Sequence, residues 1–318
     1  MNVLVTGAGG FIGSHLCEKL LENPELRVTG VDGFVQPRLK AEKLSNLRRL
    51  LPHPRFAFVE AALQKVEWES LLPQTDAVFH LAGMPGVRSS WGADFSKYVL
   101  HNIAVTQRLL EACVKHPPGR LIFSSTSSVY GQKSGSVAED SPPEPLSPYG
   151  VSKLTGEHLC RVYGESFGVP FVILRYFTVY GPRQRGDMAF HRFIRQLHRG
   201  KPLQVNGDGL QSRDFTFVKD CVAGTAAALD APGIVGETIN IGGMERATVL
   251  ETIAMLERIS GKKASIRTGG AARGEPKTTW ADIAKARKLL GYRPTVRLED
   301  GLRLQWNAMI NDDEGGQP

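Results

Sequence analysis

The sequence predicts an α/β protein with a doubly wound parallel sheet and a smaller C-terminal domain. Short β-branched runs alternate with amphipathic stretches through the first half, and a glycine-rich turn follows the first run. After about Arg175 this strict alternation fades and Gly- and Pro-containing turns separate shorter elements. Strands that alternate with helices are typical of a parallel sheet covered on both faces, with ligands at the carboxyl ends of its strands.

The expected elements follow from hydrophobic periodicity and from Pro residues just past the ends of three helices. Near the C-terminus we expect helices around 248–260, 281–290 and 298–311, and a frayed polar tail over Asp312–Pro318. In the first part we expect strands at Asn2–Thr6, Arg27–Asp32, Phe56–Glu60, Ala77–Leu81, Leu121–Ser124 and Phe171–Leu174, and helices at Gly13–Leu21, Ala41–Leu51, Ile103–Lys115 and Tyr149–Phe167.

The same pattern predicts the domain organisation. Residues 1–175 are expected to form a dinucleotide-binding domain to which 212–242 returns. Residues 176–211 and 243–318 are expected to form the smaller substrate-binding domain.

Composition excludes several classes of protein. The chain has 318 residues and a net charge of +7, but no basic block is interleaved with aromatic residues, so nucleic-acid binding is not favoured. No apolar run approaches the roughly 18 residues that cross a bilayer, and the N-terminus has no signal-peptide pattern. The densest basic stretch, 183–201, is either a solvated helix face or a site for an anionic small molecule.

Cysteine spacing indicates neither a metal site nor a disulfide framework. The four cysteines are far apart and lack metal-ligand spacing, which predicts a reduced, cytoplasmic chain without a metal. They are Cys17, Cys113, Cys160 and Cys221.

A dinucleotide site is predicted at the first turn. Gly7, Gly10 and Gly13 follow the first strand and open a helix, where glycines allow a tight turn and close approach to a pyrophosphate. Asp32 ends the second strand, 19 residues past Gly13, where a carboxylate bonds ribose hydroxyls. Because an acid there repels a 2′-phosphate, the pattern favours NAD over NADP.

Tyr149 and Lys153 are the candidate catalytic pair. They are four residues apart on one predicted helix, so both side chains project from one face. A nearby ammonium, together with the positive nicotinamide ring, is expected to favour the phenolate of Tyr149, whose ordinary pKa is about 10. A Ser/Thr-rich turn, Ser124–Gly131, follows the fifth strand at its carboxyl end and places hydroxyls there, Thr126 among them.

Together these motifs resemble the extended short-chain dehydrogenase/reductases, specifically the nucleotide-sugar epimerase/dehydratase family with its Rossmann fold. The resemblance covers nearly the whole chain and implies bound NAD, a nucleotide-sugar substrate and a homodimer through the helices at 94–115 and 149–167. The motifs that carry it are the glycine turn, His80–Gly83, Asn102, the Ser/Thr turn, Tyr149 with Lys153, Arg175–Pro182 and Arg213–Phe215.

The resemblance implies a role for each matching residue. Thr126 and Tyr149 act at the sugar C4 hydroxyl, Lys153 holds the nicotinamide ribose, and Arg213 contacts the diphosphate. The cofactor set is Gly7, Gly10, Phe11, Ile12, Gly13, Asp32, Leu81, Ala82, Gly83, Asn102, Ser124, Tyr149, Lys153 and Phe177. The substrate set is Arg88, Thr126, Ser127, Ser128, Tyr149, Thr178, Arg185, Gln204, Arg213 and Arg273.

The Ser/Thr turn distinguishes members of the family. Dehydratases typically carry Thr-Asp-Glu, and UDP-xylose-forming decarboxylases carry Glu in the last position, whereas this chain has Thr126-Ser127-Ser128. Without a carboxylic acid to assist elimination, C4 epimerisation is favoured. The stretches Gly86–Arg88 and Gly181–Phe190 are similar to UDP-glucuronate 4-epimerases. UDP-glucose 4-epimerase, UDP-glucuronate decarboxylase and a non-catalytic NAD-sensing protein remain alternatives, in that order.

Arg185 is the candidate ligand of the sugar carboxylate, with Arg88 as the substitute. A 4-keto glucuronate is a β-keto acid, and an arginine paired with its carboxylate opposes loss of CO₂. Three further positions complete the expectations. Arg273 either touches the diphosphate or lies on the surface, His80 is expected to be structural, and Val59–Leu63 lacks the Asp that contacts adenine in relatives.

Overall fold

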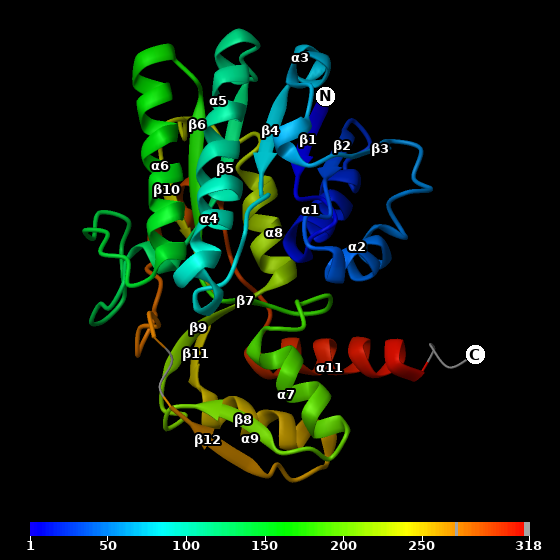
Figure 1. Ribbon diagram of the computed structural model, residues 1–318, viewed down its shortest axis with the longest axis vertical. Helices are drawn as coiled ribbons and strands as arrows, with labels where there is room; N and C mark the ends of the chain where they lie inside the picture. Colours follow the sequence, from blue (N-terminus) through cyan, green and yellow to red (C-terminus); the bar gives the residue numbers. More distant parts are fainter. Residues whose placement is uncertain (271–272, 315–318) are drawn as a thin grey trace.

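A parallel seven-stranded sheet organises the larger part of the molecule, for which a computed structural model describes residues 1–270 and 273–314 (Figure 1). Its order, β10-β6-β5-β4-β1-β2-β3, places the switch in chain direction between β1 and β4. The predicted doubly wound sheet is therefore confirmed. Its strands are β1 (Asn2–Thr6), β2 (Arg27–Asp32), β3 (Phe56–Glu60), β4 (Ala77–His80), β5 (Arg120–Thr126), β6 (Phe171–Tyr176) and β10 (Thr238–Ile241).

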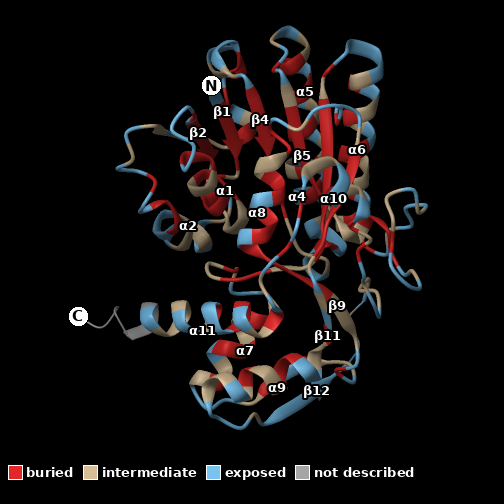
Figure 2. Cartoon of the chain, turned by 180° about the vertical axis from the view of Figure 1, so that it is seen from behind, coloured by how far each residue is buried: buried red, intermediate tan, exposed pale blue. Residues whose placement is uncertain are grey.

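Burial on both faces explains the apolar strands. In β1 the side chains of Val3 and Val5 enter one core cluster, while Leu4 enters a second cluster on the opposite face. This is the period-2 alternation of a strand covered on both sides. Figure 2 shows the central strands buried between helices that expose their outer faces. Strands β5 and β6 each extend two residues past their expected ends, which carries Thr126 and Tyr176 to the edge where ligands bind.

Helices cover the two faces as separate layers. Helix α1 packs against α8, and α5 packs against α6. Helix α2 ends at Leu47, four residues earlier than expected, and α5 begins at Val105 after a π-helical turn at Val99–Ala104. The helices of this part are α1 (Phe11–Leu21), α2 (Lys40–Leu47), α3 (Trp68–Leu71), α4 (Phe95–Tyr98), α5 (Val105–Lys115), α6 (Pro148–Phe167), α8 (Val218–Ala227) and α10 (Ala284–Leu290).

Helix α6 has clear start and stop signals. The Ser147 hydroxyl accepts a hydrogen bond from Gly150 N at 3.1 Å, and Pro148 occupies the first turn, where its missing N–H costs nothing. Gly168 ends the helix with a φ of 72°, a left-handed conformation that suits glycine. These caps fix the start of the helix and thus the position of Tyr149 in its first turn.

The smaller part lies below the carboxyl ends of the large sheet in Figure 1 and contains two small sheets. Strand β9 pairs with β7 and β11, whereas α8 and β10 lie with the large sheet and α10 packs on β10. The predicted domain boundaries remain a prediction. Of residues 212–242, α8 and β10 lie with the large sheet, whereas β9 belongs to a small sheet. The elements are β7 (Val179–Tyr180), α7 (Ala189–His198), β8 (Leu203–Asn206), β9 (Ser212–Phe217), β11 (Glu245–Thr248), α9 (Val249–Ser260), β12 (Ile266–Gly269) and α11 (Leu298–Glu314).

The C-terminal helix is longer than expected. Helix α11 continues through Glu314, so the expected frayed tail from Asp312 is wrong for its first three residues; the remainder of that tail lies outside the described residues. Among the described helices, none is both long and apolar enough to span a membrane. All four cysteines are buried and free.

Candidate active site

The glycine turn forms a cradle at the switch point of the sheet. Gly7 has a φ of +75°, and its N–H donates to Val31 O at 2.8 Å. A Cβ at Gly13 would lie 2.1 Å from Gly7 O, so only glycine lets α1 start this close to the turn. No side chain caps α1, and the N–H groups of its first turn, Phe11 to Gly13, lack intrahelical acceptors. This is the arrangement that receives a pyrophosphate.

Asp32 lies at the end of β2, as the motif requires. Its carboxylate is 5% exposed and accepts from Phe34 N at 3.1 Å. Lys43 Nζ of α2 lies 2.8 and 3.0 Å from the two carboxylate oxygens. Sequence reasoning missed Lys43, which orients the acid and balances its charge; the hydrophilic face of α2 carried no motif that identified it.

The turn after β4 meets the glycine turn. A Cβ at Gly7 would lie 2.9 Å from Ala82 N, and that N–H donates to Thr6 Oγ1 at 3.1 Å. Leu81, Ala82 and Gly83 therefore flank the cradle, as predicted for cofactor-binding residues. His80 is structural: its ring nitrogens bond Thr6 and Thr106 hydroxyls at 2.8 and 3.0 Å, and burial lowers its pKa to about 3.

The side chains of two predicted cofactor-binding residues, Asn102 and Phe177, make contacts within the protein itself. Asn102 is 2% exposed; its oxygen accepts from Met84 N at 2.6 Å, and its two N–H groups donate to Met84 O and Ser152 Oγ. It braces the turn after β4 against α6. The side chain of Phe177 is 1% exposed and packs against Tyr130, so a direct contact with a ligand requires its backbone. Ser124, 8% exposed, lies near the end of β5.

Tyr149 and the Ser/Thr turn are brought together by close packing. A Cβ at Gly150 would lie 2.6 Å from Ser128 O, so the start of α6 rests directly on the turn. Thr126 Oγ1 accepts from Ser128 N at 3.2 Å, which holds the turn in shape. Thr126, Ser127 and Ser128 are each half-buried, and the Thr126 side chain lies near enough to Tyr149 to oppose part of the rise in the Tyr149 pKa that burial causes.

The electrostatics of Tyr149 differ from the expectation. Burial raises the pKa of Tyr149, and only part of that shift is offset by the hydrogen bond with Thr126 and by the charge of Arg185. The Lys153 ammonium, 6% exposed, lies over the Phe123 ring at 4.3 Å, and burial lowers its pKa from 10.5 to about 8. In the protein alone desolvation outweighs the favourable contributions. The phenolate expected beside both the ammonium and the nicotinamide ring stays a prediction.

A buried carboxylate joins α6 to two neighbouring strands. Arg175 of β6 donates through Nε and Nη2 to the two oxygens of Glu157 at 2.9 and 2.6 Å, and Ser125 of β5 donates to the same carboxylate. Glu157 lies one helical turn beyond Lys153, and Ser125 directly precedes Thr126. The hydrogen bond from Ser125 thus links the helix that carries Tyr149 to the strand that carries Thr126, and the ion pair with Arg175 holds the carboxylate in place.

Two of the predicted substrate arginines converge. Arg88 Nε lies 2.7 Å from Glu275 Oε1, and Arg213 Nη2 lies 3.4 Å from Glu275 Oε2. With its amide oxygen turned toward Arg88, Asn206 accepts from both terminal nitrogens of the guanidinium at 2.8 Å. Sequence reasoning missed Asn206 and the pairing role of Glu275. These groups come from the end of β8, from β9 and from two loops, which no local motif connects.

Two other predicted substrate residues are peripheral. Gln204 is exposed on β8, on the same strand face as Asn206 but two residues away. Arg273 is exposed, and its loop instead turns Glu275 toward Arg88 and Arg213. Neither side chain is placed by a contact with the other candidates in the described structure.

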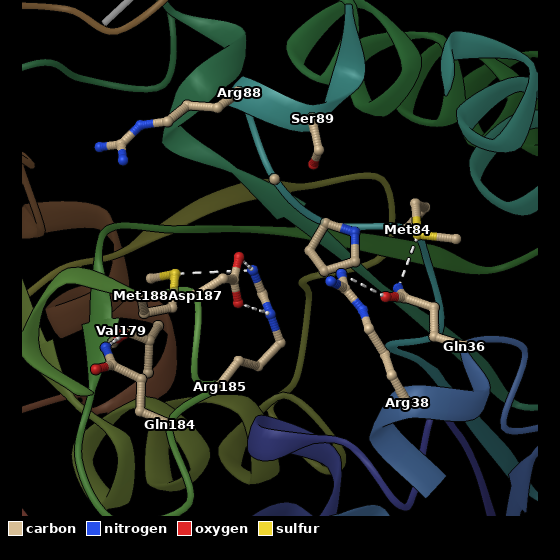
Figure 3. Close-up of polar contacts among 12 residues, drawn as sticks. Gln36, Arg38, Met84, Arg88, Ser89, Val179, Gln184, Arg185, Asp187 and Met188 are labelled. Atoms are coloured by element: carbon tan, nitrogen blue, oxygen red, sulfur yellow. Dashed lines mark hydrogen bonds and ion pairs between the residues drawn. The ribbon is translucent and has the colours of Figure 1, made fainter. Parts of the chain in front are cut away.

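Arg185 lies on the loop that follows β7. Figure 3 shows it between the loop with Arg38 and the loop with Arg88, its guanidinium turned toward Asp187. The Arg185–Asp187 pair is bidentate at 2.9 and 2.8 Å. Burial raises the pKa of Tyr149 and of Tyr98, and the charge of Arg185 opposes part of each rise. The ring of Tyr98 packs edge-on against Tyr149 at 6.2 Å. Thr178, half-buried, directly precedes β7.

Comparison with known proteins agrees with this geometry. Residues 3–242 match the model of the NAD dependent epimerase/dehydratase family. The chain is 56% identical to an uncharacterised UDP-glucose epimerase, YtcB, of Bacillus subtilis (95% of this chain, 96% of that protein). It is 38% identical to a UDP-glucuronate 4-epimerase of Thermodesulfobacterium geofontis (94% and 93%).

A solved structure also matches this chain over nearly its whole length. The UDP-glucuronic acid 4-epimerase of Bacillus cereus, in complex with UDP-glucuronic acid and NAD, is 54% identical, covers 98% of this chain and 99% of its own, and superposes with a TM-score of 0.96. The glycine cradle, the open start of α1 and the carboxylate at the end of β2 fit NAD. The chain belongs to the NAD dependent epimerase/dehydratase family.

Proposed function

We propose that the protein is a UDP-glucuronate 4-epimerase, an isomerase that forms UDP-galacturonate through a transient 4-keto sugar. The observation that carries the proposal is the turn Thr126-Ser127-Ser128 beside the start of α6, which offers hydroxyls in place of a carboxylic acid. Arg185 supports it, because its charge opposes the burial that raises the pKa of Tyr149. A cation on this side of the site suits a sugar whose C5 bears a carboxylate. The B. cereus relative bound to UDP-glucuronic acid and NAD supports the same substrate.

Tyr149 is the base for the C4 hydroxyl. Bound NAD supplies reversible hydride acceptance at C4. Tyr149 Oη takes the hydroxyl proton as the ketone forms and returns it after the sugar has presented its other face. The neighbouring Thr126 hydroxyl, which opposes part of the rise in the Tyr149 pKa that burial causes, stabilises the phenolate. Lys153, with a pKa of about 8, is mainly protonated at neutral pH and can donate to the nicotinamide ribose hydroxyls.

Arg185 protects the 4-keto sugar from decarboxylation. In that reaction the C5–C6 bond breaks, its electron pair moves into an enolate across C5 and C4, CO₂ leaves, and water later protonates C5. Arg185 pairs with the carboxylate and stabilises the charge that this step disperses. A charge-assisted bond of about 1.5–3 kcal/mol slows the side reaction by roughly 10- to 100-fold. Ser127, Ser128 and Thr178 supply hydroxyls to the same carboxylate.

Arg88 and Arg213 bind the diphosphate. Both guanidinium groups already face one anion, the Glu275 carboxylate, which marks a position where negative charge is stabilised. Burial lowers the pKa of Arg213 and Glu275 offsets part of this shift, so the pair needs an anion nearby. A diphosphate provides one with more acceptor oxygens.

A UDP-glucose 4-epimerase is the second candidate. The name of the 56% identical relative favours it, whereas the cation beside Tyr149 favours the uronate. Turnover of both UDP-sugars by the same preparation separates the two. Faster turnover of UDP-glucose than of UDP-glucuronate reverses the order.

The assembly is a homodimer in the cytoplasm. The two segments expected to pair expose apolar side chains: Val99 and Leu100 in the turn before α5, and Val151 and Val162 on one face of α6. A second copy that covers them removes this apolar surface from water. The four buried, free thiols support a reducing compartment.

Arg185→Ala tests the proposed sugar. We expect a higher KM for UDP-glucuronate and a tenfold or greater rise in the share of CO₂ and UDP-keto-pentose among the products, because the carboxylate loses its cation. The measurement is product analysis by NMR with parallel CO₂ detection. Arg273→Ala, an exposed arginine, is the control and leaves both quantities unchanged. Wild-type behaviour of Arg185→Ala contradicts the assignment of a sugar acid.

A further inference from the structure

The loop Gly181–Met188, which carries Arg185, is held by side chains from outside it. Its own backbone makes short turns, with Gln184 N donating to Gly181 O at 3.2 Å and Met188 N to Arg185 O at 3.0 Å. Arg183 has a φ of 65°, a left-handed conformation that a non-glycine residue keeps only when its surroundings enforce it. The position of Arg185 therefore depends on the partners of its two neighbours.

Helix α1 holds Arg183. Arg183 Nη2 lies 2.7 Å from Glu18 Oε1, and Nη1 donates to Ser14 Oγ at 3.3 Å. Ser14 is in the first turn of α1, directly after the glycine cradle. One side of the loop is thus attached to the element that binds the cofactor.

Helix α11 holds Gln184 from the other side. Gln305 is fully buried and Gln184 is 3% exposed. Gln305 Nε2 donates to Gln184 Oε1 at 3.0 Å, and Gln305 Oε1 accepts from Gly181 N at 3.1 Å. Gln184 in turn donates to Val179 O at 3.1 Å, a contact drawn in Figure 3, and accepts from His191 N at 3.2 Å. One side chain of α11 therefore fixes both the beginning and the middle of the loop.

Stability alone does not account for this buried amide pair. Two well-packed apolar side chains in place of a buried hydrogen-bonded pair are often neutral for stability, whereas hydrogen bonds fix distance and angle. Arg185 directly follows Gln184, so a shift of the amide moves the guanidinium relative to Tyr149. Displacements of about 1 Å near a reacting group have large effects on catalysis.

We propose that Gln305 is a positioning residue: through Gln184 and Gly181 it holds the loop Gly181–Met188 so that Arg185 meets the sugar carboxylate, and it thereby sets the ratio of epimerisation to decarboxylation. This inference rests on the proposed function. It assigns to the C-terminal helix, which lies far from the glycine turn in the sequence, a part in product specificity.

The test compares Gln305→Leu, which keeps the volume but removes both hydrogen bonds, with Leu302→Ala on the same helix. Leu302 is fully buried, so its truncation destabilises the packing of α11 while leaving the two hydrogen bonds of Gln305 in place. With UDP-glucuronate as substrate, we expect Gln305→Leu to raise the fraction of CO₂ and UDP-keto-pentose three- to tenfold and to raise KM. We expect Leu302→Ala to lower the melting temperature but to keep the wild-type product ratio. Gln305→Met is the second variant if Gln305→Leu does not accumulate as folded protein.

A double variant separates the inference from the proposed function. In an Arg185→Ala background, Gln305→Leu adds no further change in product ratio if it acts through Arg185. If Arg185→Ala shifts the ratio and Gln305→Leu does not, the positioning role is wrong and the proposed function stands. If Arg185→Ala itself leaves the ratio and KM unchanged, the carboxylate assignment fails, and the inference fails with it. If Leu302→Ala shifts the product ratio as much as Gln305→Leu does, the effect comes from a general loosening of α11, and the proposal is also overturned.

Discussion

The cofactor side and the sugar-nucleotide side of the site are built in different ways. The cofactor side uses backbone geometry: a left-handed glycine, an open helix start and one carboxylate at a strand end, all within the first 32 residues. The sugar side uses arginines from three separate segments, strand β9 among them, and each arginine is already paired with an acid, Glu275 or Asp187. The cofactor side is preformed by chain direction and close packing. The sugar-nucleotide side consists of ion pairs, in which an anion of the substrate replaces the protein carboxylate when the substrate binds.

Tyr149 lies between the two sides, and its removal is expected to have the largest effect. Tyr149→Phe removes the proton acceptor at C4 and lowers kcat at least 10³-fold, within the range of general acid–base catalysis. Bound NAD, measured by absorbance after release, stays at the wild-type level because the glycine cradle is intact.

Tyr98→Phe is the matched control. Tyr98 is the adjacent ring, and its hydroxyl bonds Ser89 Oγ at 2.7 Å and Gly86 O at 2.9 Å. Its loss loosens the loop that carries Arg88, so we expect KM to rise by less than about tenfold with little change in kcat. Comparable kcat losses in both variants contradict the role of Tyr149 as the base.

Lys153→Met tests how much the buried ammonium on the cofactor side lowers the free energy of unfolding. The depression of the Lys153 pKa from 10.5 to about 8 corresponds to roughly 3 kcal/mol. Below pH 8 both folded and unfolded chains carry the proton, so the full cost of burial is present and the variant is more stable by up to that amount. Between pH 8 and 10.5 only the unfolded chain keeps the proton, so the stability of the wild type rises and the difference disappears.

Urea denaturation at pH 7, 9 and 10.5 measures this difference. Lys97→Met, at an exposed lysine, is the control and changes the free energy of unfolding by less than about 0.5 kcal/mol at any of these pH values. A stability difference for Lys153→Met that is constant from pH 7 to 10.5 would show that the ammonium is not desolvated.

Arginine substitutions test the sugar-nucleotide side with UDP alone. The Arg213 side chain is 15% exposed and that of Arg88 is 48% exposed. The better shielded cation contributes more, so Arg213→Ala should weaken UDP binding roughly 10- to 100-fold and Arg88→Ala by less than about tenfold. Isothermal titration calorimetry gives both values. Exposed Arg273→Ala serves as the control, and a larger loss for it than for Arg213→Ala reverses the assignment of the diphosphate ligand.

The success of sequence reasoning follows the same division. The glycine cradle, Asp32 and the start of α6 were predictable because short-range spacing, strand ends and caps determine them. The structural role of His80 was also predictable, since a histidine at the end of a buried strand needs internal partners. The other site residues are determined by contacts between elements that lie far apart in the sequence. Lys43, Asn206, Glu275 and Gln305 reach the site from elements with no recognisable motif, and Asn102 turned inward because its amide satisfies the turn after β4.

The pKa of Tyr149 illustrates a different limit. The spacing of Tyr149 and Lys153 was correctly interpreted as one helix face, but the sign of the shift depends on desolvation and on where the ammonium lies. Both are properties of the packed core around α6 and β5. Periodicity in the sequence identifies the face of the helix and does not determine how far the ammonium lies from the phenol.

UDP-glucuronate deuterated at C4 tests the central claim most directly. Oxidation and return of hydride at the same carbon within one closed site predict UDP-galacturonate that keeps the deuterium at C4, with no net CO₂ and no exchange with solvent. Mass spectrometry and NMR of the product read the label. Deuterium lost to water, or a product without a new configuration at C4, would contradict the account.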